Sequence, residues 1–163
     1  MTRTAVLRGN TSATNPSPQC DLANGWTQHG SNCYNLKADT RKSWAAARHD
    51  CVQDGGDLVS IVTAEEEQYV TGSLDPSWID LWIGLSTLVR GAYCGEYNVC
   101  YSWSDGTPLS HTNWGSGEPN NHEGREECVE MVSSSNGTYS WWNDLNCDSM
   151  SKAIYRQLQP TVN

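Results

Sequence analysis

Apolar residues recur at helical spacing in the first third of the folded region. Trp44, Ala47 and Cys51 fall at positions i, i+3 and i+7, which predicts one buried stripe along a helix. We expect Asp39 or Thr40 to cap this helix and the two consecutive glycines that follow it to end it. The stripe is therefore predicted to be core.

A second helix is predicted to begin at Thr63. Glu66 follows three residues later and completes a capping-box pattern, and Gly72 and Pro76 end the helical stretch. The acidic run 65–67 is favourable near the positive N-terminal end of a helix. We interpret this run as a solvated face and not as a metal site.

The periodicity then shortens to that of strands. Residues 81–85 form a compact apolar run, residues 128–132 alternate between apolar and polar, and residues 139–142 are aromatic and strand-like. Between them, residues 105–127 are rich in Gly, Pro, Asn, Ser and Glu without a regular pattern. An irregular segment of that length inside a domain is usually functional, and the chain as a whole is predicted to be α+β.

Length and composition indicate one folded domain with extensions. The chain has 163 residues, which is typical of one domain. Residues 1–19 are rich in Thr, Ser, Asn and Pro and are predicted to be a flexible stalk or linker. We place the domain at 20–158 and a tail at 159–163. No apolar stretch reaches about 18 residues, so no direct membrane insertion is expected.

The charge balance excludes some partners. Lys and Arg number 10 and Asp and Glu 19, so the net charge is -9. This acidity argues against a surface that neutralises nucleic-acid phosphates or anionic lipids. An acidic protein can instead hold hard cations where its carboxylates converge.

Seven cysteines without a CxxC pair indicate disulfides and an oxidising compartment. We therefore expect an extracellular protein, either secreted or the ectodomain of a membrane receptor. The sequons at Asn10 and Asn136 fit N-glycosylation and agree with that compartment.

No motif predicts an enzyme. The run His122–Glu126 lacks the second histidine of the HExxH zinc signature and lies in a segment without helical pattern. There is no GxSxG motif and no phosphate-binding loop, and all four histidines are interpreted as ordinary surface residues. A binding protein is predicted.

Oxygen ligands gather in and after the irregular segment. Glu118-Pro119-Asn120 comes first, the pair Glu126-Glu127 follows, and Asn143-Asp144 lies further on. Calcium takes six to eight oxygen ligands, whereas zinc prefers His and Cys, so this set suits calcium. Taken singly, each piece is also typical of a turn or a solvated loop.

The order of these motifs resembles that of C-type lectin domains, and the resemblance covers nearly all of residues 20–155. It implies a double-loop α+β fold whose long loop carries calcium. The matching residues are Trp44, Ala47, Cys51, Gly55, Leu58, Ile61, 82–85, 103–106, 113–114, 117–121, 126–128 and 142–144.

The resemblance implies one site that serves both calcium and sugar. It also implies a cis peptide between Glu118 and Pro119. Two vicinal sugar hydroxyls would complete the coordination of the ion, each donating to a carboxylate and accepting from an amide. The implied calcium and sugar residues are Glu118, Asn120, Glu126, Asn143 and Asp144, with the Asp144 backbone carbonyl as a further ligand.

The Glu-Pro-Asn motif goes, in the family, with mannose, fucose and N-acetylglucosamine. Mannose-type glycans on glycoproteins or microbial surfaces are therefore the expected partners, and oligomers would supply avidity. Residues 86–90 lack the acidic ligands of the family's auxiliary calcium, so one principal site is expected. A module that binds a protein or another non-sugar ligand is the alternative. Trp114 and Trp142 match core positions of the family, and the role of Trp141 stays open.

The resemblance also implies the disulfides Cys20–Cys33 and Cys128–Cys147, and a bridge between Cys94 and Cys100 is expected from the remaining cysteines. Cys51 is left over, because Tyr155 stands where relatives have its partner. We expect Cys51 to be a buried, inert thiol, with an intermolecular bridge as the alternative.

Overall fold

The computed structural model describes residues 20–37, 41–72, 80–88, 100–134, 136, 138–149 and 155–157. The predicted stalk and tail, Asn10 and Cys94 lie outside these residues, as do the predicted caps Asp39 and Thr40 and the helix breaker Pro76. Within the described part of the chain, no helix is long and apolar enough to cross a membrane.

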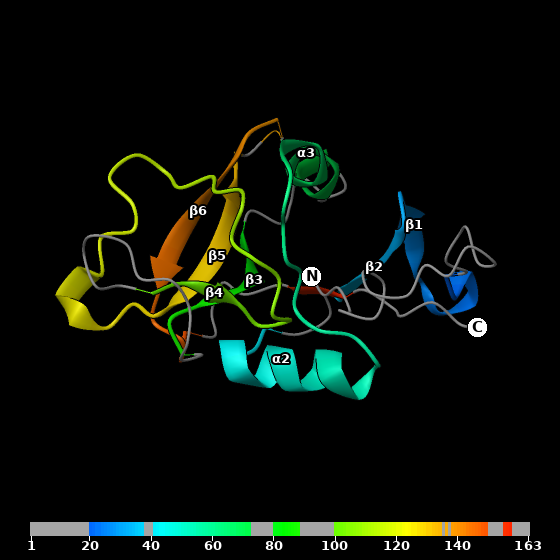
Figure 1. Ribbon diagram of the computed structural model, residues 1–163. Coiled ribbons are helices and arrows are strands. Elements are labelled where there is room, and N and C mark those ends of the chain that lie inside the picture. Colours follow the sequence, from blue (N-terminus) through cyan, green and yellow to red (C-terminus); the bar gives the residue numbers. More distant parts are fainter. Residues whose placement is uncertain are drawn as a thin grey trace.

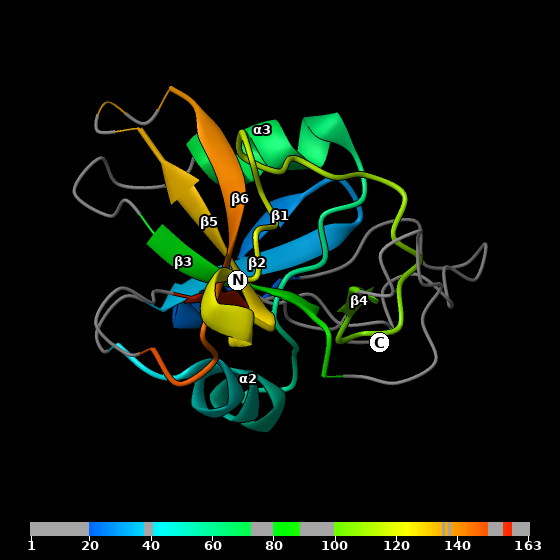
Figure 2. The same cartoon turned by 90° about the vertical axis from the view of Figure 1, so that its left-hand side faces the viewer.

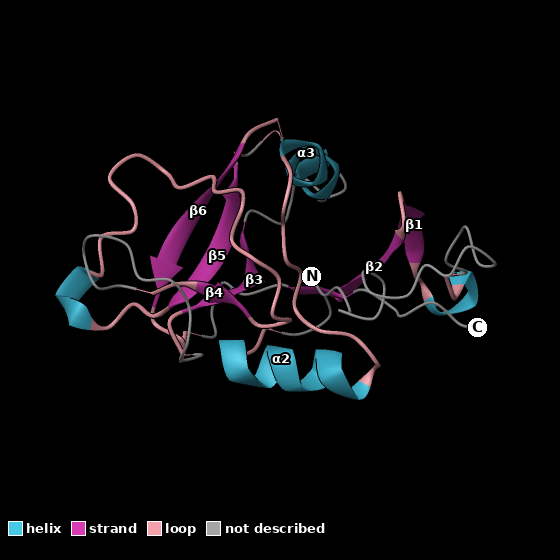
Figure 3. Cartoon of the chain, viewed as in Figure 1, coloured by secondary structure: helices cyan, strands magenta, loops and turns pink. Residues whose placement is uncertain are grey.

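Two helices and a set of short strands make up the fold (Figures 1 and 3), which confirms the predicted α+β class. The helices are α2 (Trp44–Gln53) and α3 (Ala64–Gly72), and two short 3-10 helices are η1 (Leu22–Asn24) and η2 (His122–Gly124). The strands are β1 (Thr27–His29), β2 (Asn32–Lys37), β3 (Asp80–Ser86), β4 (Ser102–Trp103), β5 (Cys128–Ser133), β6 (Ser140–Leu145) and β7 (Tyr155–Gln157).

The strands form one sheet in the order β1-β2-β7-β3-β5-β6, and β4 pairs with β3. The pairs are antiparallel except for β3 with β7. The two helices lie on opposite sides of the sheet (Figures 1 and 2). The β5–β6 hairpin runs in register from Cys128↔Leu145 to Ser133↔Ser140, so the C-terminal end of β6 lies beside the start of β5, where the long irregular segment ends.

Helix α2 buries the predicted stripe of Trp44, Ala47 and Cys51. Its cap is Ser43, whose side chain accepts a hydrogen bond from the Ala46 N–H at 3.3 Å. The prediction of a cap at residue 39 or 40 was wrong, because Ser43 has the extended backbone from which a side-chain oxygen reaches the open N–H groups of the first turn.

Helix α3 begins directly after the predicted residue, Thr63. The Thr63 hydroxyl accepts from the Glu66 N–H at 3.0 Å, as a capping box requires. The Glu66 carboxylate reaches back to the Val62 N–H at 3.0 Å, one residue earlier than in the standard motif. The capping pattern therefore located the start of the helix correctly, although the second bond has a different donor.

The acidic run of α3 is not the solvated face that the sequence suggested. Glu65 is exposed, but Glu66 and Glu67 are only 5% and 6% exposed. Tyr34 donates its hydroxyl proton to Glu66 at 2.7 Å. The prediction failed because Tyr and Trp provide most of the aromatic core, and their polar atoms need buried acceptors.

Glu67 is the acceptor at the centre of this arrangement. Its carboxylate receives the indole N–H of Trp142 at 3.1 Å, the amide of Asn113 at 2.9 Å and the hydroxyl of Ser140 at 3.1 Å. Burial raises the pKa of the Glu67 carboxyl, and these hydrogen bonds oppose the increase. One side chain thus joins α3 to β6 and to the long irregular segment.

His111 belongs to the same cluster, so the interpretation of all four histidines as ordinary surface residues was wrong. The ring packs edge-on against Trp142 at 5.8 Å. Its Nε2 atom is buried, lies 3.5 Å from Glu67 and has no hydrogen-bond partner in the described residues. His29 also makes a specific contact, because it stacks on Tyr69 with the ring centroids 4.0 Å apart.

Strand β3 is buried along its whole length, as its apolar run predicted. Strand β5, in contrast, does not alternate: four consecutive residues, 128–131, are buried. Both of its faces are covered, because Val129 and Met131 pack into the aromatic core beneath α3 while Cys128 joins the cluster beneath α2. A strand inside a layered fold loses the alternation of a half-exposed one.

Disulfides join Cys20 to Cys33 and Cys128 to Cys147. Cys100 is also disulfide-bonded, and its predicted partner lies outside the described residues. Cys51 is a buried thiol outside these bridges, within the cluster beneath α2.

Replacement of Glu67 tests the central acceptor. Glu67→Ala should lower the free energy of unfolding by about 2–4 kcal/mol, because it leaves the buried Trp142 N–H without an acceptor. Glu67→Gln keeps one acceptor oxygen, so its free energy of unfolding should decrease by a smaller amount. Urea unfolding monitored by fluorescence measures both.

Glu65→Ala is the matched control on the same helix, since the Glu65 side chain is 84% exposed. It should change stability by no more than about 0.5 kcal/mol. Equal losses for the two alanine variants would contradict the structural role of Glu67.

Candidate functional site

The long irregular segment ends beside the C-terminal end of β6. Figure 1 shows η2, in yellow, next to the arrowhead of that strand. The peptide between Glu118 and Pro119 is cis, as the resemblance implied. Asn121 and Glu123 have φ values of +46° and +57°, a left-handed region that non-glycine residues adopt infrequently. The loop therefore has a defined and unusual path at the predicted ligand residues.

Asp144 fastens this loop to β6. Its two carboxylate oxygens accept the backbone N–H groups of Asn120 at 3.1 Å and Asn121 at 2.7 Å. The Asp144 residue is fully buried. A carboxylate that accepts two N–H bonds is a strong anchor, so the position of the Glu-Pro-Asn motif is set by the strand.

Glu118 and Glu126 complete a carboxylate cluster around this anchor. Glu118 accepts the side-chain amide and the backbone N–H of Asn120, both at 3.2 Å. Glu126 accepts the backbone N–H of His122 at 2.8 Å. These bonds leave acceptor capacity on each carboxylate, because an ionised carboxylate has about four lone-pair sites.

The carboxyls of Glu118 and Glu126 both have raised pKa values. Burial and the neighbouring Asp144 raise the pKa of Glu118 to about 7. Burial and the charge of Asp144 also raise the pKa of Glu126, although the His122 N–H opposes this. Negative charge is thus concentrated at the end of β6.

Tyr101 is a residue of this site that the sequence reasoning missed. It is 7% exposed, and its hydroxyl is buried with no hydrogen-bond partner in the described residues. Burial and the charge of Asp144 raise its pKa. The available signal was its position, two residues before the strand residue Trp103 and next to a cysteine.

Asn143 stands apart from the other four predicted residues. Its amide donates to Glu130 on the paired strand at 3.1 Å, and no hydrogen bond joins it to Glu118, Asn120 or Glu126 in the described residues. It reaches the site only as the neighbour of Asp144. Glu130, which fixes the orientation of this amide, was not predicted.

The donor set fits calcium better than a softer metal. Within the described residues, no group of three His, Cys, Asp or Glu side chains is already arranged as a metal cage. The candidate ligands are nevertheless all oxygen donors. Glu118, Asn120, Glu126, Asn143 and Asp144 are the residues that would hold a calcium ion.

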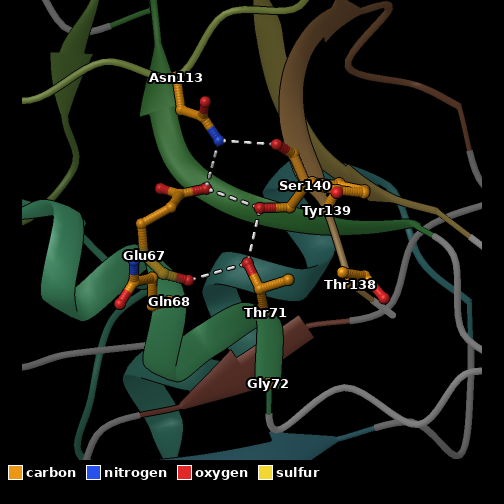
Figure 4. A pocket seen from close by; sticks show the side chains of 8 residues that line it. All are labelled: Glu67, Gln68, Thr71, Gly72, Asn113, Thr138, Tyr139 and Ser140. Atoms are coloured by element: carbon orange, nitrogen blue, oxygen red, sulfur yellow. Dashed lines mark hydrogen bonds between the residues drawn. The ribbon is translucent and has the colours of Figure 1, made fainter. Parts of the chain in front are cut away.

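A separate cleft of about 450 Å³ lies between α3 and β6 (Figure 4). Its polar atoms already bond to one another: the hydroxyls of Thr71 and Ser140 are 2.6 Å apart, and Asn113 donates to Glu67 and to the Ser140 carbonyl at 2.9 Å each. These groups hold the helix to the strand. The cleft is therefore a structural junction, away from the carboxylate cluster.

Comparison with known proteins agrees with this arrangement. The family model for the Lectin C-type domain matches residues 40–154. C-type lectin lectoxin-Lio3 of Erythrolamprus poecilogyrus is 37% identical over 128 residues, which are 76% of this chain and 73% of that protein. C-type mannose receptor 2 of Mus musculus is 32% identical over 88% of this chain, although the match spans only 9% of the receptor.

Solved structures show the same fold. The C-type carbohydrate-recognition domain of cow CD23, determined in the presence of a GlcNAc2Man3 oligosaccharide, has a TM-score of 0.72 and 31% identity over 90% of this chain and 99% of its own. A calcium-independent type II antifreeze protein has a TM-score of 0.70 and 29% identity over 89% of this chain and 97% of its own. Because the family model covers well over half of the sequence, the chain belongs to the C-type lectin domain family.

Proposed function

We propose that this domain binds mannose-type glycans through a calcium ion held by the long loop. The observation that carries the proposal is the hydrogen bonding of the loop at the end of β6. Asp144 accepts the N–H groups of Asn120 and Asn121, while Glu118 and Glu126 accept those of Asn120 and His122. Calcium, when bound, would supply open coordination positions for two vicinal hydroxyls. The function is recognition of a diol and involves no chemical change of the sugar.

The side chains would orient the sugar by their hydrogen-bond capacity. A carboxylate accepts a hydroxyl proton while an amide donates to the same oxygen. Glu118 and Asn120 already bond to each other, so they are placed to share one hydroxyl. Glu126 and Asn143 would share the other, which requires Asn143 to exchange part of its bond with Glu130.

The relatives support a sugar ligand without fixing which one. The cow CD23 domain was crystallised with a mannose-containing oligosaccharide. A lactose-binding lectin of Anguilla japonica is 35% identical over 80% of this chain, so galactose-type binding also occurs among relatives. We assign the mannose type from the pair Glu118 and Asn120.

A non-sugar ligand is the second candidate, and one observation favours it. The antifreeze protein shares the fold at a TM-score of 0.70 and is described as calcium-independent. The fold can therefore persist without the ion. The presence of all five oxygen donors in this chain supports the calcium-dependent alternative.

The setting that we propose is extracellular. Two described disulfides agree with an oxidising compartment. Asn136 is exposed, and its side-chain oxygen accepts from the Thr138 N–H at 3.1 Å, so a glycan at this asparagine would point to solvent. Single-sugar contacts should be weak, and several copies of the domain would raise avidity.

Calcium should raise the melting temperature, and Glu126→Gln should weaken calcium binding by about tenfold or more. The substitution removes one charge but keeps an acceptor for the His122 N–H. Calorimetric titration should give one tight equivalent. Glu123→Gln is the control in the same loop, because its side chain is 71% exposed and it is outside the proposed set.

Two tight equivalents would contradict the single site. Retention on immobilised mannose that a chelator does not reverse would favour the non-sugar alternative.

Exchange of the motif should change the preferred sugar. The double variant Glu118→Gln with Asn120→Asp reverses which residue accepts and which donates at one hydroxyl. On a glycan array, its binding to mannose should therefore decrease and its binding to galactose should increase. Glu127→Gln, an exposed carboxylate next to the site, should leave the ranking unchanged. An identical ranking for the double variant would refute the assignment of this pair.

Acid should release calcium and therefore the sugar. The pKa of Glu118 is raised to about 7 in the metal-free domain, so the carboxyl takes up a proton as the pH falls from 7.5 to 5.5. A protonated carboxyl cannot hold the ion, and the calcium affinity should fall by about 10- to 30-fold over this range. Titrations at three pH values measure it; an affinity that is flat from neutral pH to about pH 5 would rule out this linkage.

A further inference from the structure

Two exposed aromatic residues lie along β6 in line with the proposed site. Tyr139 is 70% and Trp141 37% exposed, whereas the alternate residues Trp142 and Asp144 are fully buried. Successive side chains of a strand point to opposite faces. Tyr139, Trp141 and Asn143 therefore share one face, which we call the aromatic row.

The row is a regular continuation of the strand. The Ser134 N–H donates to the Tyr139 carbonyl at 2.8 Å, so the hairpin pairing extends to Tyr139 beyond the end of β6. Residues two apart on a strand are separated by about 7 Å. The row thus leads in two steps from Asn143, beside the carboxylate cluster, along the hairpin toward the α3 end of the molecule (Figure 1).

Trp141 is fixed in place by the loop. A Cβ atom at Gly115 would come within 2.7 Å of its Cδ1 atom, so the indole lies directly on the Gly115 backbone. That backbone is itself paired with the strand, because the Gly115 N–H donates to the Trp142 carbonyl at 2.9 Å. A ring held in this way offers its outer face without a large loss of side-chain entropy on binding.

The polar atoms of the row face solvent. Of the buried tryptophans, Trp44, Trp82 and Trp142 donate their indole N–H to protein acceptors, whereas the N–H of Trp103 has no acceptor in the described residues. Neither the indole N–H of Trp141 nor the hydroxyl of Tyr139 has a hydrogen-bond partner in the described part of the chain. Each side chain therefore presents a ring face together with an available donor.

The sequence around the aromatic row favours a neutral ligand. Residues 131–143 contain no charged side chain, in a chain of net charge -9. An aromatic face is electron-rich and attracts weakly positive C–H groups, while exposed N–H and O–H groups bind hydroxyls. A neutral molecule with both C–H faces and hydroxyls satisfies the whole row, which is the chemistry of a saccharide.

We propose that Tyr139 and Trp141 form an extended subsite that binds the second and third sugar residues of an oligosaccharide whose first residue occupies the calcium-dependent site. This inference rests on the proposed function. It makes an oligosaccharide, and not a monosaccharide, the ligand class of the domain.

Calorimetry in calcium with methyl α-mannoside and with linear α-linked mannotriose tests the row. The unaltered domain should bind mannotriose more tightly than the monosaccharide. Trp141→Ala and Tyr139→Ala should each weaken mannotriose binding by about three- to tenfold. The affinity of these variants for methyl α-mannoside should stay within about twofold of that of the unaltered domain, because this sugar does not reach the row.

Variants that retain a ring separate stacking from general damage. Trp141→Phe and Tyr139→Phe should recover most of the affinity for mannotriose. Leu22→Ala is the remote control, since Leu22 is 73% exposed and lies in η1, at the opposite end of the molecule from η2 in Figure 1. Melting temperatures monitor folding. Because Tyr139 is more exposed than Trp141, its alanine variant should disturb the fold less.

The outcomes are distinguishable. Equal affinity of the unaltered domain for the two sugars, or equal weakening of both by the alanine variants, would overturn the subsite and leave the proposed function standing. Absence of calcium-dependent binding of either sugar to the unaltered domain would overturn both.

Discussion

The hydrogen bonds between the Glu67 carboxylate and the Trp142 indole hold β6 in the position on which the site depends. Trp142 is fully buried and pairs with Met131 on β5, and its backbone N–H donates to the Asn113 carbonyl at 2.7 Å. The next two residues of the strand are Asn143 and Asp144. A buried ion without partners is costly, so the many donors to Glu67 make this anchor tolerable and fix the direction in which β6 leaves the core.

A second carboxylate, that of Asp144, fixes the loop to β6. Asp144 accepts two backbone N–H groups of the loop, so the Glu-Pro-Asn motif is located by the strand as much as by its own turn. The same carboxylate is a proposed calcium ligand. The order of the loop and the binding of calcium would therefore be linked. If calcium binding breaks or shifts these hydrogen bonds, the free energy lost in doing so lowers the affinity for the ion.

The sequence could predict those parts of the fold that depend on local pattern. The stripe of α2, the start of α3 at Thr63 and the apolar strand at 81–85 all follow from the spacing of neighbouring residues. The cis peptide between Glu118 and Pro119 is also present, although it was expected from the family resemblance and not from local pattern.

The errors arose where burial depends on distant partners. An acidic run at a helix N-terminus has the same appearance in sequence whether it faces water or the core. Glu67 is buried because Trp142, 75 positions later, brings an indole N–H to it. The burial of His111 likewise depends on a distant residue, Trp142. The role of Tyr101 depends on Asp144, which is also far away in the sequence.

The fold alone does not decide the ligand, since a calcium-independent antifreeze protein and a CD23 domain determined in the presence of an oligosaccharide share it with this chain at nearly the same TM-scores of 0.70 and 0.72. Function has to be argued from the site. In this chain, the carboxyls near the end of β6 favour the calcium-dependent case. A surface that recognises a neutral ligand directly gains nothing from three crowded carboxylates, two of which have raised pKa values. Such crowding costs stability in the metal-free state, and the binding of a divalent cation is the process that would recover it.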